Sequence, residues 1–309
     1  MKTVLPIRKI LKLRHSILVL GTILVAGAAF PASAETGPAT LSKERIGEII
    51  ASPDRSAADR TNDIRRKPDQ MLAFIGVWPG MVALDLSSGG GYTTELIARA
   101  VGPTGRVYGQ SAPRSPDRAA PAPAAPEGQS HPTAAAPGTV AAAPAAVVAA
   151  PAAVAAPRPA GRTSAQALAE RAKNPAVANM VAVVQPFEAP IPPEVASNKL
   201  DLVTLMFNYH DLGFLGVDRA QMNSAVYAAL KPGGMYVIAD HSGRSGTGIS
   251  ESGTLHRVEE AFLRKEVEAA GFKLAEEGYF LRNPSDPRDK NTPDPPQPKD
   301  EFVLKFVKP

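Results

Sequence analysis

The stretch MVALDLSSGGGYTTELIARAVGPTGRVYGQ, residues 81–110, constrains the fold more than any other part of this chain. It opens with a short apolar run, residues 81–86, that is typical of a buried parallel strand. A glycine cluster follows, then a helical segment over 93–101 that the sequence GPTG ends, and then a second apolar run over 106–110. Strand, glycine turn, helix and strand in this order predict one parallel crossover unit.

Strands and helices continue to alternate along the rest of the chain. Apolar runs predict further strands within residues 179–187, 200–206, 235–240, 272–280 and 301–307, and helical patterns cover residues 163–174, 218–230 and 254–271. We expect the last two strands to pair with each other. The alternation predicts an α/β fold with a doubly wound sheet, preceded by a helical lead-in over residues 35–80, and a ligand site at the carboxyl ends of the strands.

An abrupt change in composition interrupts this pattern. Alanine and proline make up 32 of the 50 residues from 111 to 160, and the segment has no aromatic residue. Such a segment buries too little apolar surface to offset its ordering entropy, and its prolines interrupt helices. We therefore expect a disordered insertion over residues 111–162.

The first 34 residues have the three parts of a secretory signal. A basic segment precedes an apolar run over residues 17–30, and the small residues Ala32 and Ala34 follow it. We expect cleavage after Ala34 and an exported protein, periplasmic or secreted. The apolar run is shorter than the roughly 20 residues that span a membrane, so we expect no stable membrane span after cleavage.

Charge and cysteine content exclude several kinds of site. The formal net charge is +4, but the first 34 residues hold five basic residues and no acid, so the rest of the chain is close to neutral. A nearly neutral chain gives no reason to expect a nucleic-acid partner. The chain has no cysteine, which excludes disulfides, thiolate metal sites and cysteine nucleophiles.

The glycine stretch resembles the first motif of class I S-adenosylmethionine-dependent methyltransferases, in which alternating glycines follow an acidic residue. LKPGG with MYVIAD resembles the turn and fifth strand of that family, and LDLVTLMFNYHDL its fourth-strand motif. The closing sequences TLHRVEEAFLRKEVEAAGF, LRNPSDPRD and FVLKFVKP resemble a subgroup of exported, predicted methyltransferases. The resemblance covers about residues 69–110 and 163–309. It implies a Rossmann-like domain over residues 81–309 with seven mostly parallel strands and an antiparallel last strand.

The resemblance implies S-adenosylmethionine as the cofactor and assigns loop residues to it. Gly89 and Gly91 match the second and third motif glycines, and Asp85 matches the acidic residue, all on the methionine side of the cofactor. Ser87 replaces the first glycine, which narrows the space for the ligand.

Three further residues follow from the same resemblance. Gln110 stands where the family usually presents an acid to the ribose, and its amide forms weaker hydrogen bonds than a carboxylate. Phe187 stands where the family covers the adenine, although a core position fits it equally well. Asn208 follows the fourth strand and belongs to the same expected cofactor site.

Candidate catalytic groups gather at the predicted ends of the fourth and fifth strands. A histidine beside a carboxylate is a general-base pair, and this description fits His210, His241 with Asp240, and His256. Tyr209 offers a hydroxyl at the same edge. A helix-capping or structural role fits each single residue as well as a catalytic one.

Three functions are compatible with these features. Methyl transfer from S-adenosylmethionine to a small-molecule acceptor agrees with most of them. An exported protein that keeps this fold but has lost turnover and binds a ligand agrees with Ser87 and Gln110. A metal-dependent hydrolase would use the histidines and aspartates, but no close His-x-His or His-x₃-His pair is present, so we expect no metal ligands. The oligomeric state does not follow from the sequence.

Overall fold

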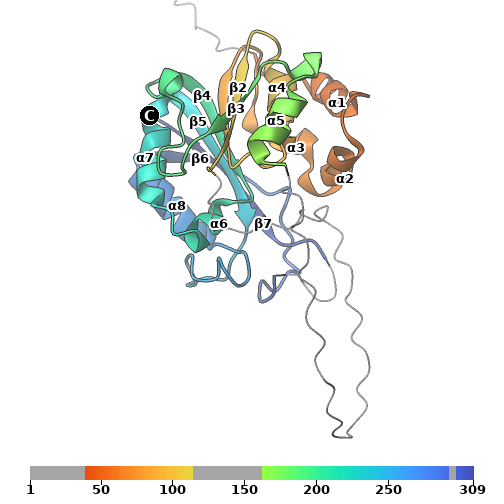
Figure 1. Cartoon of the computed structure of the whole chain (residues 1–309). Helices are drawn as coiled ribbons and strands as arrows, with labels where there is room; N and C mark the ends of the chain where they lie inside the picture. Colours follow the sequence, from red (N-terminus) through yellow and green to blue (C-terminus); the bar gives the residue numbers. More distant parts are fainter. Residues whose placement is uncertain (1–38, 114–161, 292–296) are drawn as a thin grey trace, which may run out of the picture. The chain divides into compact units, whose positions relative to one another are not determined.

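The computed structural model describes residues 39–113, 162–291 and 297–309 (Figure 1). The predicted signal peptide, its cleavage site and nearly all of the alanine- and proline-rich insertion lie outside these residues. In the part of the chain that is described, no helix combines the length and the apolar content needed to cross a membrane.

Seven strands form one sheet in the order β3-β2-β1-β4-β5-β7-β6. The strands are β1 (Val82–Leu86), β2 (Arg106–Ser111), β3 (Met180–Val184), β4 (Leu200–Met206), β5 (Leu230–His241), β6 (Lys273–Gly278) and β7 (Glu301–Val307). The first five run parallel to their neighbours, and β7 runs antiparallel to both β5 and β6. This topology confirms the expected α/β fold with its antiparallel last strand, and the last two strands pair as expected.

Helices cover both faces of the sheet (Figure 1). They are α1 (Lys43–Ala51), α2 (Ala57–Arg66), α3 (Pro68–Ile75), α4 (Tyr92–Val101), α5 (Ser164–Arg171), α6 (Tyr209–Phe214), α7 (Arg219–Ala229) and α8 (Glu260–Ala269), with short 3-10 turns at Pro175–Val177 and Pro193–Val195. In Figure 1, α1 to α5 lie on one side of the sheet, and α7 and α8 lie on the other.

Two apolar clusters, one on each face, hold these layers together. Along β1, Ala83 belongs to one cluster and Leu84 and Leu86 to the other, because successive side chains of a strand point to opposite faces. The lead-in helices share the first cluster, where Ile46 of α1 and Ile75 of α3 pack with residues of α4. The lead-in is therefore part of the same packed unit as the sheet.

The structure differs from the sequence prediction after β4 and before α8. Helix α6 forms directly after β4, where no helix was expected, and α8 starts at Glu260 instead of near residue 254. His256 has a left-handed backbone (φ 50°), which interrupts a helix. The Val258 N–H donates to the His241 carbonyl at 3.1 Å, so this segment is bound to the end of β5.

The sheet has a topological switch point between β1 and β4. The neighbours β2 and β3 lie on one side of β1, and β4 and β5 lie on the other. In open α/β sheets, ligands bind outside the carboxyl ends of the strands at such a point. This edge of the sheet, where the arrowhead of β5 points and α6 lies in Figure 1, therefore holds the candidate site.

Candidate functional site

The glycine loop connects the carboxyl end of β1 to the first turn of α4. Ser87, Gly89 and Gly91 have positive φ angles of 53°, 53° and 86°, and Gly91 is the residue at which α4 begins. Ser87 adopts a backbone region that non-glycine residues rarely occupy. Gly89 and Gly90 are exposed, and a Cβ atom added to Gly90 would meet no atom within 4 Å. The outer face of the loop is therefore open for a ligand to approach the backbone.

The inner side of the loop is bound to the end of β2. The Ser87 N–H donates to Gln110 Oε1 at 3.0 Å, and the Ser88 N–H and hydroxyl both donate to the Gln110 carbonyl at 2.9 Å. Gln110 Nε2 donates to the Gln185 carbonyl at 2.6 Å, and the Gln110 side chain is fully buried. The expected ribose contact of Gln110 is therefore corrected, because its amide joins the glycine loop to the residue that follows β3.

Asp85 lies beneath the loop as a buried acid. Its carboxylate accepts hydrogen bonds from the Thr94 hydroxyl at 2.6 Å and the Thr204 hydroxyl at 2.8 Å. Burial raises the pKa of Asp85 to about 6, although the two hydroxyls act in the opposite direction. Asp85 therefore ties α4 and β4 to β1, and its carboxylate is not exposed to solvent in this structure.

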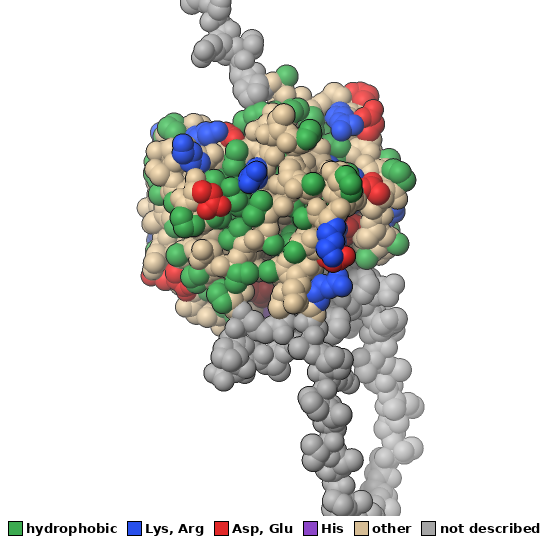
Figure 2. Space-filling model, turned by 45° about the horizontal axis from the view of Figure 1, so that its top comes forward, with side chains coloured by type: hydrophobic (Ala, Val, Ile, Leu, Met, Phe, Trp, Pro, Cys, Tyr) green, Lys and Arg blue, Asp and Glu red, His purple; other side chains and the backbone are tan. Residues whose placement is uncertain are grey.

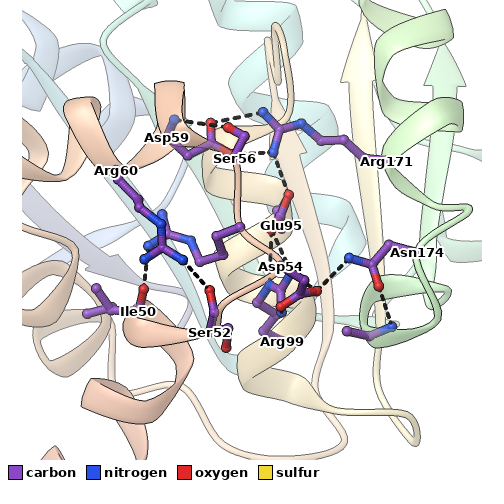
Figure 3. Close-up of polar contacts among 12 residues, drawn as sticks. Ile50, Ser52, Asp54, Ser56, Asp59, Arg60, Glu95, Arg99, Arg171 and Asn174 are labelled. Atoms are coloured by element: carbon purple, nitrogen blue, oxygen red, sulfur yellow. Dashed lines mark hydrogen bonds and ion pairs between the residues drawn. The ribbon is translucent and has the colours of Figure 1, made fainter.

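Helix α5 closes one flank of the loop through Arg171 (Figure 3). Its guanidinium donates to the Gly90 carbonyl at 2.6 Å, pairs with Asp59 of α2 at 2.6 Å and also contacts Glu95 of α4. Gly91 has no room for a side chain here, because an added Cβ would lie 2.8 Å from Leu168. Sequence reasoning missed this network, since its members come from three helices far apart in the chain.

A small cavity lies at the switch point, between α3, the start of α4 and the end of β4. Its volume is about 20 Å³, which suits a water molecule. Most of its lining is apolar, with Tyr92 and Phe207 on the side of the strand ends. The Arg66 guanidinium lies over both rings, 5.1 Å from the centre of Tyr92 and 4.7 Å from that of Phe207.

A histidine–carboxylate cluster, which we define as His210, Asp211, Asp240 and His256, lies at the ends of β4 and β5. His210 Nδ1 is 2.6 Å from Asp240 Oδ1, and the His210 N–H donates to Asp240 Oδ2 at 2.8 Å. Asp211 Oδ1 lies 3.2 Å from His210 Nε2 and 3.3 Å from His256 Nδ1. The ring centres of His210 and His241 are 5.4 Å apart, and those of Phe207 and His241 are 5.7 Å apart. Phe207 lines the cavity and packs against His241, and His241 packs against His210. These rings connect the cavity to the cluster.

The cluster has an inner and an outer part. His210 and Asp240 are buried, with side chains 4% and 0% exposed, whereas the side chains of Asp211 and His256 are 33% and 42% exposed. Burial alone lowers the pKa of His210, but the adjacent carboxylates of Asp240 and Asp211 raise it to about 10. Solvent therefore reaches the cluster only from the side of Asp211 and His256.

His241 packs against this cluster without sharing its side-chain hydrogen bonds. Its side chain is 13% exposed, and Nδ1 lies 2.9 Å from Glu301 Oε1 in a geometry that does not form a hydrogen bond. Burial lowers the pKa of His241 well below its usual value, and the charge of Lys299 acts in the same direction. His241 therefore packs behind the cluster, with a small part of its side chain exposed.

Tyr209 points away from the edge of the sheet and corrects the expectation of a substrate-facing hydroxyl. Its side chain is fully buried, and its hydroxyl donates to Glu266 at 2.8 Å and accepts from the Asn223 amide at 3.1 Å. It is a core residue between α6, α7 and α8, because the turn after β4 directs its side chain to the face that these helices cover.

The remaining predicted residues lie near the edge of the sheet but do not form one surface. Asn208 Nδ2 donates to Asp211 Oδ2 at 3.0 Å, so it supports the cluster. Phe187 is partly buried and packs against the apolar cluster under α7 and α8. The structure therefore separates a loop side, with Asp85 to Gly91, from a cluster side, with Asn208 to His256.

The spacing of histidines in the sequence gave no reason to expect metal ligands, but the fold brings together three residues that could bind a metal ion. Three possible donor atoms lie within 4.8 Å of one another, one each from His210, Asp211 and His256. Asp211 follows His210 in α6, whereas His256 comes from the segment before α8. Only the folded chain brings these residues together.

Comparisons with known proteins give a fold-level similarity. No protein-family model and no curated protein match the chain. Several solved structures do, at 12% to 15% identity. A SAM-dependent methyltransferase from Aquifex aeolicus is 14% identical, with a TM-score of 0.48, over 82% of this chain and 99% of the other.

Two more neighbours have related descriptions. A TehB-like SAM-dependent methyltransferase from Corynebacterium glutamicum is 15% identical, with a TM-score of 0.41, over 85% of this chain and 93% of its own. Fibrillarin from Aeropyrum pernix, solved with natively bound S-adenosyl-L-methionine, is 15% identical, with a TM-score of 0.40, over 74% of this chain and 67% of its own. Two of these three neighbours are thus described as SAM-dependent methyltransferases, and the third was solved with bound S-adenosyl-L-methionine.

Proposed function

We propose that this protein transfers a methyl group from S-adenosylmethionine to a small-molecule acceptor. The observation that carries the proposal is the glycine loop, which lies at the switch point of the sheet with its Gly89–Gly90 face open. The resemblance of residues 81–110 to the first methyltransferase motif supports the same cofactor.

The residues of the loop fit part of this cofactor. The open backbone at Gly89 and Gly90, followed by the amino terminus of α4, suits the carboxylate of the methionine part. The end of β2 does not fit the ribose, because both polar atoms of the Gln110 side chain are used within the protein. We therefore assign the loop to the cofactor and assign no ribose contact.

The cluster side is where the acceptor meets the protein. S-adenosylmethionine, when bound, supplies a methyl group on a sulfonium that is already activated for transfer. What remains for the protein is to orient the acceptor and to take up its proton where it carries one. His256 and Asp211 are the solvent-open members of the cluster, so an acceptor reaches these two first.

The face of the molecule that Figure 2 shows carries no concentrated charge. On the face shown in Figure 2, acidic and basic side chains are interspersed over the described residues, and neither sign gathers there into one patch. A nucleic-acid partner needs a concentrated positive surface. We therefore propose a small-molecule acceptor and no nucleic acid.

We further propose that the protein is exported, on the basis of the signal-like sequence of residues 1–34. The measurement is cell fractionation followed by N-terminal sequencing of the purified protein. A first residue at Glu35 supports export with the expected cleavage, and an unprocessed protein in the cytoplasm contradicts it.

The test of cofactor binding uses a glycine with open space around it. Gly90→Val adds a side chain on the open face of the loop without a steric conflict in the protein, since Gly90 has an ordinary φ. Gly47→Val in α1 is the matched control, because an added Cβ there also meets no atom within 4 Å. S-adenosylmethionine and S-adenosylhomocysteine are titrated into each purified protein by calorimetry.

We expect micromolar binding by the unchanged protein and by Gly47→Val, and binding at least about tenfold weaker by Gly90→Val. No binding up to about millimolar cofactor contradicts the proposal. Binding that persists without turnover of any acceptor favours the alternative of an exported binding protein with a methyltransferase fold.

A further inference from the structure

We propose that His210, Asp211 and His256 bind a divalent first-row transition-metal ion. This inference goes beyond methyl transfer and does not depend on the glycine loop. It starts from the three donor atoms that lie within 4.8 Å of one another at the ends of β4 and β5.

The distances within the group suit a metal ion. A tetrahedral zinc ion with bonds of about 2.0 to 2.1 Å holds neighbouring nitrogen and oxygen ligands about 3.3 Å apart. Asp211 Oδ1 lies 3.2 Å from His210 Nε2 and 3.3 Å from His256 Nδ1. Two edges of a coordination tetrahedron are therefore already present. Two imidazoles and one carboxylate are a donor set that suits zinc, iron or nickel.

The ring of His210 is oriented as in metal sites. A histidine that binds a metal through one ring nitrogen usually donates the other N–H to a carboxylate, which fixes the tautomer and the ring. Asp240 is fully buried and lies 2.6 Å from His210 Nδ1, while it also accepts the His210 backbone N–H. With Nδ1 engaged in this way, Nε2 faces Asp211 Oδ1, and a metal ion bound there would take the place of the proton on Nε2.

The carboxylate of Asp211 is held as well. Asn208 Nδ2 donates to Asp211 Oδ2 at 3.0 Å, which leaves Oδ1 facing the two histidines. Outer partners of this kind orient the ligands and raise metal affinity. His210 and Asp211 therefore each have a supporting residue.

The backbone delivers His256 to this place from a distant part of the chain. Its left-handed conformation, with φ 50°, is a local cost that the neighbouring hydrogen bonds must balance. The Val258 N–H donates to the His241 carbonyl at 3.1 Å, and the Gly243 N–H donates to the Val258 carbonyl at 2.8 Å. The segment before α8 is thus bound to the end of β5, and the position of His256 is fixed.

The outer part of the cluster leaves room for a further ligand. The side chains of Asp211 and His256 are 33% and 42% exposed, so a metal ion bound there faces solvent. Three protein ligands and an open position are typical of catalytic metal sites, whereas structural sites are closed by four. The open position would take a water molecule or an oxygen of a substrate, such as a hydroxyl or a carboxylate.

Zinc is the probe for the test. The purified protein, without an affinity tag and after treatment with a chelator, is titrated with Zn²⁺ in the absence of S-adenosylmethionine. The variants are His256→Asn and Asp211→Asn, and the control is Asp289→Asn, which removes an exposed carboxylate outside the cluster. Asparagine tolerates the left-handed backbone at position 256, so His256→Asn should fold. Circular dichroism checks this, and Co²⁺ replaces Zn²⁺ for visible absorption spectra.

We expect one Zn²⁺ per chain with a dissociation constant in the micromolar range or below, weakened at least about tenfold in both cluster variants and unchanged in Asp289→Asn. The Co²⁺ protein should show visible bands of bound ion that His256→Asn loses. Equal binding by all four proteins, or no binding at about 100 µM Zn²⁺, overturns the proposal. Gly90→Val should bind Zn²⁺ normally, which separates a failure of this site from a failure of the cofactor site.

Discussion

The buried carboxyl of Asp85 makes the stability of this protein depend on pH in a way that one substitution removes. Both of its oxygens accept threonine hydroxyls, at 2.6 Å from Thr94 and 2.8 Å from Thr204, and no solvent reaches it. Asp85→Asn keeps the shape of the side chain. The amide oxygen still accepts one hydroxyl, and the amide NH₂ donates to the other hydroxyl oxygen.

The magnitude follows from the raised pKa. Burial moves the pKa of Asp85 from 3.8 to about 6 in the folded protein. The folded state therefore keeps a proton that the unfolded state has lost, so the free energy of unfolding falls as the pH rises through this window. Each pKa unit corresponds to about 1.36 kcal/mol. The raised pKa therefore lowers the free energy of unfolding by about 1 kcal/mol at pH 4.5 and by about 3 kcal/mol at pH 8.

The assay is urea unfolding at about pH 4.5 and about pH 8, for the unchanged protein, for Asp85→Asn and for Asp289→Asn as a control at an exposed position. The free energy of unfolding of Asp85→Asn, relative to the unchanged protein, should rise by about 2 kcal/mol between the two pH values. The control should show no such change. A relative stability of Asp85→Asn that is independent of pH, or that falls as the pH rises, would refute this account of the buried acid.

Three further substitutions test the packing around the site, each by urea unfolding. Arg171→Ala removes the guanidinium partner of the nearly buried Asp59, whereas Glu95 keeps Arg99, and should cost about 3 kcal/mol. Arg264→Ala at an exposed ion pair should cost less than about 1 kcal/mol. Gly91→Ala places a side chain at a positive φ with its Cβ 2.8 Å from Leu168, and should lower the free energy of unfolding by more than about 1 kcal/mol. Gly90→Ala should leave the stability nearly unchanged. Tyr209→Phe should lower the free energy of unfolding by about 1 to 2 kcal/mol, because the acceptor Glu266 is only half-buried. Cofactor and metal binding should stay unchanged, and altered binding would contradict the place of Tyr209 in the core.

The elements of the sheet were predictable from sequence because the local signals agree with the fold. The predicted strands at residues 200–206 and 301–307 match β4 and β7, and the glycine loop lies where the motif put it. The absence of a helix over residues 254–259 was not predictable. The pattern of this segment is helical, but hydrogen bonds between Val258 and the end of β5 override the local preference.

The site was predictable in its location but not in its contacts. The strand ends indicated where His210, Asp240 and His256 would gather, since carboxyl ends of parallel strands share one edge. The role of Gln110 did not follow from its position, because its hydrogen bonds go to a loop 23 residues earlier and a strand 75 residues later. Arg171 gave no signal at all, since its partners belong to helices α2 and α4.

The position of β7 inside the sheet also governs the order in which the chain can fold. β7 is made of residues 301–307 and lies between β5 and β6, and β6 pairs with no strand but β7 among the described residues. During synthesis, the open edge of β5 and the whole of β6 therefore lack a partner until residues 301–307 have left the ribosome. The exported chain that we propose would thus complete its sheet only once residues 301–307 are available, which favours passage across a membrane before folding. Removal of residues 301–309 should accordingly prevent folding of the whole domain, and not only remove one edge strand from the sheet.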